Sequence, residues 1–145
     1  MKLTELVPIL QIAIGPVILI SGVGLLLLSM TNRLGRVIDR SRLLADGLRK
    51  CLPGERARFT SQLDVLSRRA RLVRMAIILA TFSMLLAAVL IIVLFLGALF
   101  QLEIGAIVVI IFVGCLGSLI GSLVAFIGDV NLSLSALKLE IAASE

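Results

Sequence analysis

The sequence contains no histidine, tryptophan or tyrosine, and only two cysteines. Without histidine the chain lacks the most common metal ligand and acid-base group, and without tryptophan and tyrosine it lacks the usual aromatic anchors at membrane interfaces. It also has no phosphate-binding glycine loop and no metal-ligand spacing. Cys51 lies in a charged segment and Cys115 in an apolar one, so we expect two reduced thiols. We therefore expect no enzyme, no metal and no cofactor.

Charged side chains are missing from three long apolar stretches, residues 7–30, 75–100 and 104–127. Because a helix rises ~1.5 Å per residue and the hydrocarbon core is ~30 Å thick, roughly 20 residues suffice to cross a bilayer. Of the 145 residues, 60% are hydrophobic, and the mean hydropathy is +1.19. The first stretch is longer than the apolar region of a signal peptide and precedes no small-residue cleavage site, so we expect it to stay attached. The sequence predicts an all-α membrane protein with three transmembrane helices in a single domain.

The segment between the first two spans, residues 33–74, is strongly basic. It contains twelve Arg and Lys against four Asp and Glu, a net charge of +8, whereas the connection at residues 101–103 has no basic residue. Because basic loops stay in the cytoplasm, this asymmetry predicts an outer N-terminus and a cytoplasmic C-terminus in a bacterial inner membrane. We expect the arginines to contact anionic lipid headgroups. Nucleic-acid binding is not expected, because no aromatic platform or reader motif accompanies them.

Hydrophobic residues in the basic segment follow the spacing of a helical hairpin. Steps of three and four connect Leu34 to Leu48 and then Phe59 to Val73, and a turn signal, Pro53-Gly54, lies between the two series. Residues 130–143 continue the third span with the same spacing in Val130, Leu134, Leu137 and Ile141. We expect a cytoplasmic helical hairpin at residues 33–74 and a cytoplasmic C-terminal helix.

The third span has one face made of small residues. Steps of three and four return to the same side of a helix, and such faces allow close helix packing in membranes. The sequence leaves open whether the first span or another subunit packs there. The residues are Gly114, Gly117, Ser118, Gly121, Ser122, Ala125 and Gly128.

One face of the first span carries a stripe of polar, small and apolar residues that continues into basic residues. In a ring of identical subunits such a face lines a pore with an apolar constriction and a basic inner mouth, since an apolar constriction gates by dewetting. Alternatively, its small residues receive the third span. The candidate pore-lining residues are Gln11, Gly15, Ile18, Gly22, Leu25 and Ser29, and the candidate basic mouth or lipid contacts are Arg33, Arg36 and Arg40.

Asp129 is an acidic residue at the inner end of the third span. A charge at this depth is costly unless it is paired. We expect an ion pair with Arg33 or Arg74, with ion coordination or gating as the alternative. We expect a homo-oligomer, because a protein with only three spans has a surplus of small-residue faces. Two functions of different classes follow from the sequence. One is a homo-oligomeric ion channel lined by the first span, and the other is a non-conducting scaffold whose basic stalk binds anionic lipids or a protein partner.

Residues 13–40, AIGPVILISGVGLLLLSMTNRLGRVIDR, resemble the signature of a family of small bacterial membrane proteins, the domain of unknown function 2721. The resemblance covers most of the chain. It implies a bacterial protein with three membrane spans, and it implies no activity and no functional residues.

Overall fold

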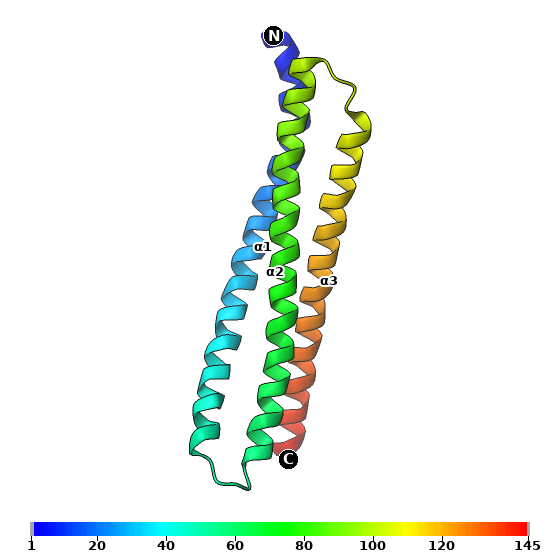
Figure 1. Cartoon of the computed structure of the whole chain (residues 1–145). Helices are drawn as coiled ribbons and strands as arrows, with labels where there is room; N and C mark the ends of the chain where they lie inside the picture. The colour runs from blue at the N-terminus through cyan, green and yellow to red at the C-terminus, as the bar shows by residue number, and fades with distance from the viewer. Residues whose placement is uncertain (1, 145) are drawn as a thin grey trace. The chain divides into compact units, whose positions relative to one another are not determined.

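The computed structural model describes residues 2–144 and consists of three long helices (Figure 1). They are α1 (Leu3–Lys50), α2 (Arg56–Phe100) and α3 (Gly105–Ser144). Each contains a window long and apolar enough to cross a membrane. Each helix also continues without interruption into the more polar residues of the expected hairpin, 33–74, or of the expected C-terminal helix, 130–143. The predicted all-α fold with three transmembrane helices is confirmed.

The contacts divide the chain into two compact units. Unit 1 comprises Met1–Leu28 and Ile78–Gly121, and unit 2 comprises Ser29–Ile77 and Ser122–Glu145. In each unit, segments of all three helices lie side by side (Figure 1). Each unit thus contains segments of the same three helices, and the single domain expected from the sequence stays a prediction.

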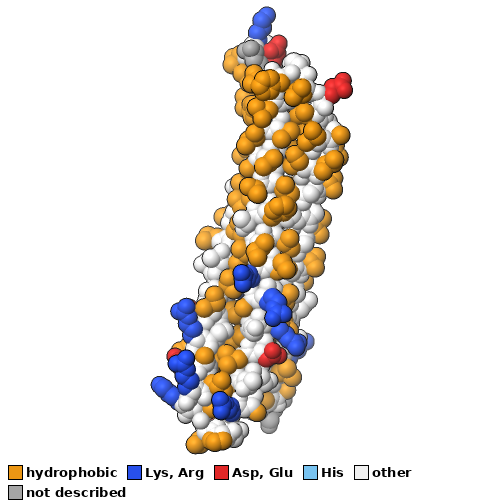
Figure 2. All heavy atoms as spheres, in the orientation of Figure 1, with side chains coloured by type: hydrophobic (Ala, Val, Ile, Leu, Met, Phe, Trp, Pro, Cys, Tyr) orange, Lys and Arg blue, Asp and Glu red, His pale blue; other side chains and the backbone are white. Residues whose placement is uncertain are grey.

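Unit 1 has a thin core and an apolar surface. Its buried apolar residues are mostly small, and larger apolar side chains cover the face seen in Figure 2. The buried residues are Ala13, Val23, Ala80, Ala87, Leu90 and Cys115. Because apolar surface is favourable toward lipid and small residues allow helices to approach closely, this distribution fits a membrane-embedded bundle.

Unit 2 carries most of the charge and has a core of larger side chains. Met30, Val37, Leu66 and Val73 are buried, and Lys and Arg are prominent on its surface (Figure 2). The predicted hairpin seams occupy its interior, because each of their residues is buried or half-buried. These residues are Leu34, Val37, Ser41, Leu44, Leu48, Phe59, Leu63, Leu66, Ala70 and Val73.

The predicted C-terminal helix is the end of α3, but its apolar seam is mostly uncovered. Val130 is half-buried, whereas Leu134, Leu137 and Ile141 are each just over half exposed. The spacing correctly indicates that the helix continues. It does not indicate that α1 and α2 leave this seam largely uncovered.

Two short connections join the helices. Residues 51–55 connect α1 to α2 at the predicted Pro53-Gly54 turn. At the other connection, Gln101 has a left-handed backbone with a φ of 53°, and the amide of Leu102 donates to the Gly97 carbonyl at 3.0 Å. This pattern is a Schellman motif, which ends a helix by satisfying its last carbonyls. The Gln101 side chain also donates to the Ala98 carbonyl at 3.2 Å.

Candidate functional site

A buried ion-pair cluster connects all three helices within unit 2. Asp129 of α3 is fully buried. The Nε atom of Arg33, on α1, lies 2.7 Å from Asp129 Oδ2, and the Nε–H of Arg69, on α2, donates to Asp129 Oδ1 at 3.3 Å. One carboxylate therefore neutralises part of the charge of two guanidinium groups from two other helices.

The two arginines are held differently. Arg69 donates a hydrogen bond, whereas the Nε–H of Arg33 is not aligned with Oδ2 for one, so that contact is an ion pair only. Arg33 gains a second attraction because its guanidinium lies over the Phe126 ring, 5.4 Å from the centroid. The Arg33 and Arg69 side chains are 24% and 16% exposed. The cluster keeps a net charge of +1 and reaches the surface through its cations.

The structure brings Asp129 together with Arg33, one of the two partners expected from the sequence. The second expected partner, Arg74, is exposed and takes no part in the ion pairs found among residues 2–144. Arg69 takes that place. Arg74 directly precedes the second span and so matches Asp129 in depth, whereas Arg69 lies on the face of α2 that meets α3.

A signal for Arg69 is present in the spacing of polar residues on α2 and α3. Arg69 contacts Asp129 in unit 2, and Ser83 contacts Cys115 in unit 1. Arg69 and Ser83 are two heptads apart on α2, and Cys115 and Asp129 are two heptads apart on α3. In two antiparallel helices a step of seven along one matches a step of seven back along the other. Once the Ser83–Cys115 contact fixes the register of α2 against α3, the same spacing pairs Asp129 with Arg69.

The small-residue face of α3 packs against α2. In unit 1, Ser118 Oγ donates to the Leu79 carbonyl at 2.7 Å, and Ser83 Oγ donates to the Cys115 carbonyl at 2.9 Å. In unit 2, Ser122 Oγ donates to the Ala76 carbonyl at 2.6 Å. The sequence left two partners open for this face, the first span and another subunit. The partner within the chain is instead the second span, because hydroxyl groups need a nearby acceptor in an apolar surrounding.

The glycines of this face differ in how closely α2 approaches them. A Cβ atom on Gly121 would lie 3.2 Å from Leu79 Cδ1, and one on Gly114 would lie 3.5 Å from Leu86 Cδ1. A Cβ on Gly128 would meet Leu72 at 3.7 Å, and Gly117 has nothing within 4 Å. Ala125 is half-buried. Close packing thus centres on Gly121.

Most of the first-span stripe lies on the outside of the chain. Ile18 and Leu25 are 65% and 70% exposed, and Gln11 and Ser29 are exposed as well. A Cβ atom on Gly15 or on Gly22 would meet nothing within 4 Å. Gly15 nevertheless lines a cavity with Cys115 and Leu116 of α3, so the alternative in which these small residues receive the third span stays a prediction.

The three arginines of the expected pore mouth have different surroundings. Arg33 belongs to the Asp129 cluster. Arg40 lies 3.4 Å from Glu140 in an ion pair whose side chains are both more than half exposed. Arg36 is exposed and joins none of the ion pairs among the described residues. Two of the three arginines thus form ion pairs with acidic residues of α3.

Comparison with known proteins identifies one family. A family model described as a protein of unknown function, DUF2721, matches residues 13–139. No curated protein and no solved structure matches the chain. Three apolar helices and this match over most of the sequence place the chain among integral membrane proteins, and it belongs to the DUF2721 family.

Proposed function

We propose that the protein is a non-conducting membrane scaffold whose exposed arginines bind anionic lipid headgroups. The observation that carries the proposal is the state of Arg36, Arg71 and Arg74. All three are exposed, and none joins the ion pairs found within residues 2–144. We call these three residues the basic collar.

The position of the collar along the helices fits lipid headgroups. Arg74 directly precedes the apolar stretch 75–100, Arg71 lies one turn earlier, and Arg36 lies one turn beyond Arg33 on α1. A free cation near an anionic leaflet gains ~1 kcal/mol. Three such residues together favour anionic over zwitterionic lipid by an amount that a stability measurement detects.

Titration of the lipid-depleted protein with phosphatidylglycerol or phosphatidylcholine tests the proposal, with the thermal unfolding midpoint as the readout. We expect phosphatidylglycerol to raise the midpoint of the wild type more than phosphatidylcholine does. The triple variant R36Q/R71Q/R74Q should lose this difference. R42Q/R49Q/R56Q removes the same charge from exposed residues farther from the apolar stretches and should keep it. Equal responses to the two lipids, or equal loss in both variants, would contradict the proposal.

A second candidate is a homo-oligomeric channel in which α1 lines an axial pore. It is supported by the exposure of Ile18 and Leu25 and by the open surface at Gly22. These residues are free for a pore or for contact with another subunit. We place the channel second because the pairing of two of the three expected mouth arginines reduces the charge available at a pore mouth.

Planar-bilayer recording distinguishes the two candidates. If α1 lines a pore, L25S should raise conductance by hydrating the apolar constriction, and R36Q should move the reversal potential toward cations under a salt gradient. G15L should alter the mass of the assembly in mild detergent. Absence of current from wild type and both recorded variants, each verified as folded, would reject the channel.

A further inference from the structure

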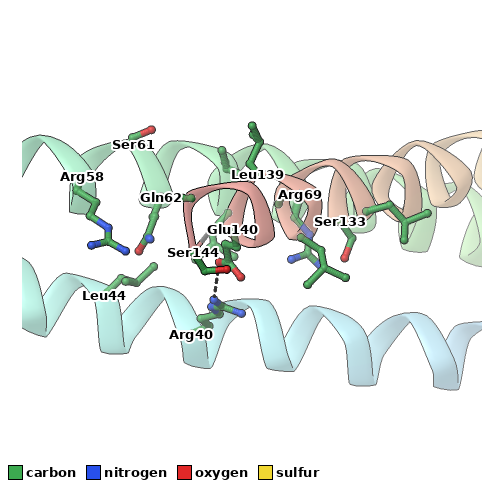
Figure 3. A pocket seen from close by; sticks show the side chains of 16 residues that line it. Arg40, Leu44, Arg58, Ser61, Gln62, Arg69, Ser133, Leu139, Glu140 and Ser144 are labelled. Carbon is green, nitrogen blue, oxygen red and sulfur yellow. Dashed lines mark hydrogen bonds and ion pairs between the residues drawn. The ribbon is translucent and has the colours of Figure 1, made fainter.

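Unit 2 contains a groove of about 820 Å³ lined by all three helices. Figure 3 shows Arg58 and Gln62 of α2 pointing toward α1, and Arg40 of α1 pointing toward Glu140 of α3. The groove shares Arg69 with the ion-pair cluster, and none of its other lining residues belongs to that cluster or to the basic collar. We propose that it binds an acidic amphipathic helix of a partner protein.

The walls of the groove have the periodicity of helix packing. On α2 the lining includes Arg58, Gln62, Val65 and Arg69, at steps of four, three and four. Residues at this spacing occupy one face of a helix over three turns, ~16 Å in length. One wall of the groove is thus a straight helix face.

The opposite wall repeats the pattern. On α3 the lining includes Ser133, Leu137, Glu140 and Ser144, again at steps of four, three and four. Two helix faces of equal length form a surface into which the ridge of a further helix fits. The shape of the groove therefore favours a helical occupant.

Two leucines of the α3 wall supply a reason for occupation. Leu134 and Leu137 line the groove, and each is just over half exposed. They lie five and eight residues beyond Asp129, about 7 and 12 Å along α3, past the end of the apolar stretch. Because apolar surface outside the hydrocarbon core costs free energy in water, a partner with an apolar stripe gains by covering it.

The positive charge of the lining favours a partner of negative charge. Arg40, Arg58 and Arg69 line the groove. Arg40 pairs with Glu140 and Arg69 with Asp129, so Arg58 is the lining cation outside the ion pairs found among residues 2–144 and gives the groove its excess positive charge. Charges of opposite sign on the two surfaces favour association and select partners. A second copy of the chain would bring another segment of charge +8, so an acidic helix is favoured over a copy.

Peptide binding to the full chain in phosphatidylcholine nanodiscs tests the inference. The probe is a fluorescent peptide of about three heptads with Leu at a and d and Glu at e and g, and its counterpart has Lys in place of Glu. Fluorescence anisotropy should show that the acidic peptide binds at least about tenfold more tightly than the basic one. Empty nanodiscs give the background.

Matched variants locate the binding. R40E/R58E should weaken binding of the acidic peptide at least about tenfold, and R58E alone should weaken it without breaking the Arg40–Glu140 ion pair. R42E/R49E makes the same change in charge at exposed residues outside the lining and should change affinity by less than about twofold. L137D should weaken binding, whereas L43D, at an exposed residue outside the lining, should not.

Three results would overturn the inference. They are equal binding of the two peptides, equal weakening by R40E/R58E and R42E/R49E, and a concentration-dependent dimer of the wild type that L137D abolishes. The last result would show that a second copy occupies the groove. All of these outcomes are independent of lipid binding by the basic collar, because the nanodiscs contain no anionic lipid.

Discussion

Replacement of Asp129 by Asn should destabilise the protein strongly. The carboxylate is fully buried and lies within 3.3 Å of the Nε atoms of both Arg33 and Arg69. Removing one partner of a buried ion pair costs roughly 3–5 kcal/mol, because the remaining charge is left uncompensated. The two arginine side chains are 24% and 16% exposed, so they can turn partly toward water. We therefore expect D129N to lower the free energy of unfolding by about 2–3 kcal/mol.

Variants of the two arginines separate charge compensation from packing. R33M leaves Asp129 beside Arg69, so its cost should be about 1 kcal/mol and should come mainly from the lost contact with Phe126. R33M/R69M leaves a buried carboxylate with neither cation, so its cost should exceed the sum of the two single changes. This non-additivity is the signature of a shared counter-charge.

The measurement is unfolding in mixed micelles at increasing mole fraction of a denaturing detergent, followed by circular dichroism. The matched control is D64N, because Asp64 and Arg68 form an ion pair at 3.6 Å with side chains 66% and 70% exposed. Exposed pairs contribute little, and D64N should change stability by less than about 0.5 kcal/mol. A cost for D129N as small as that of D64N, or additive costs in R33M/R69M, would refute the reasoning.

Three further substitutions test the contacts between α2 and α3 and the end of α2, all by the same unfolding assay. S122A should cost about 1 kcal/mol, because the Ala76 carbonyl loses its 2.6 Å hydrogen bond; no loss would indicate that the hydroxyl contributes nothing. G121L should cost about 1–3 kcal/mol by overpacking, since even a Cβ there lies 3.2 Å from Leu79; unchanged stability would contradict the close approach of the two helices. Q101G should stabilise by about 0.5–1 kcal/mol, because glycine adopts the left-handed backbone at lower cost; destabilisation would show that the glutamine side chain matters more than its backbone.

The helices and their turns follow from the sequence because their signals are local. Apolar length predicts the three spans, and Pro53-Gly54 predicts the break between α1 and α2. Heptad spacing also identifies the interior of unit 2 on α1 and α2. These features depend on residues close together in the chain, so one sequence is sufficient to find them.

The partners of the predicted site residues depend on which helix faces meet, and the sequence determines this less directly. The need for a counter-charge predicts Arg33 as a partner of Asp129, but the choice of Arg69 over Arg74 depends on the rotation of α2. The small residues of α3 predict close packing but do not identify α2 as the partner, since they allow any helix to approach. The serine hydroxyls add the missing specificity, because each needs a carbonyl acceptor on the facing helix.

Accessibility of Cys51 tests the central claim most directly, namely that the basic segment lies on the cytoplasmic side of a three-span membrane protein. Cys51 lies in the connection between α1 and α2 and is half-buried, and replacing Cys115 by Ala leaves it as the single thiol. We predict that a membrane-permeant thiol reagent blocks Cys51 in intact cells, and that an impermeant reagent reacts only after the membrane is opened. Labelling of Cys51 by the impermeant reagent in intact cells would place the basic segment outside and contradict the account.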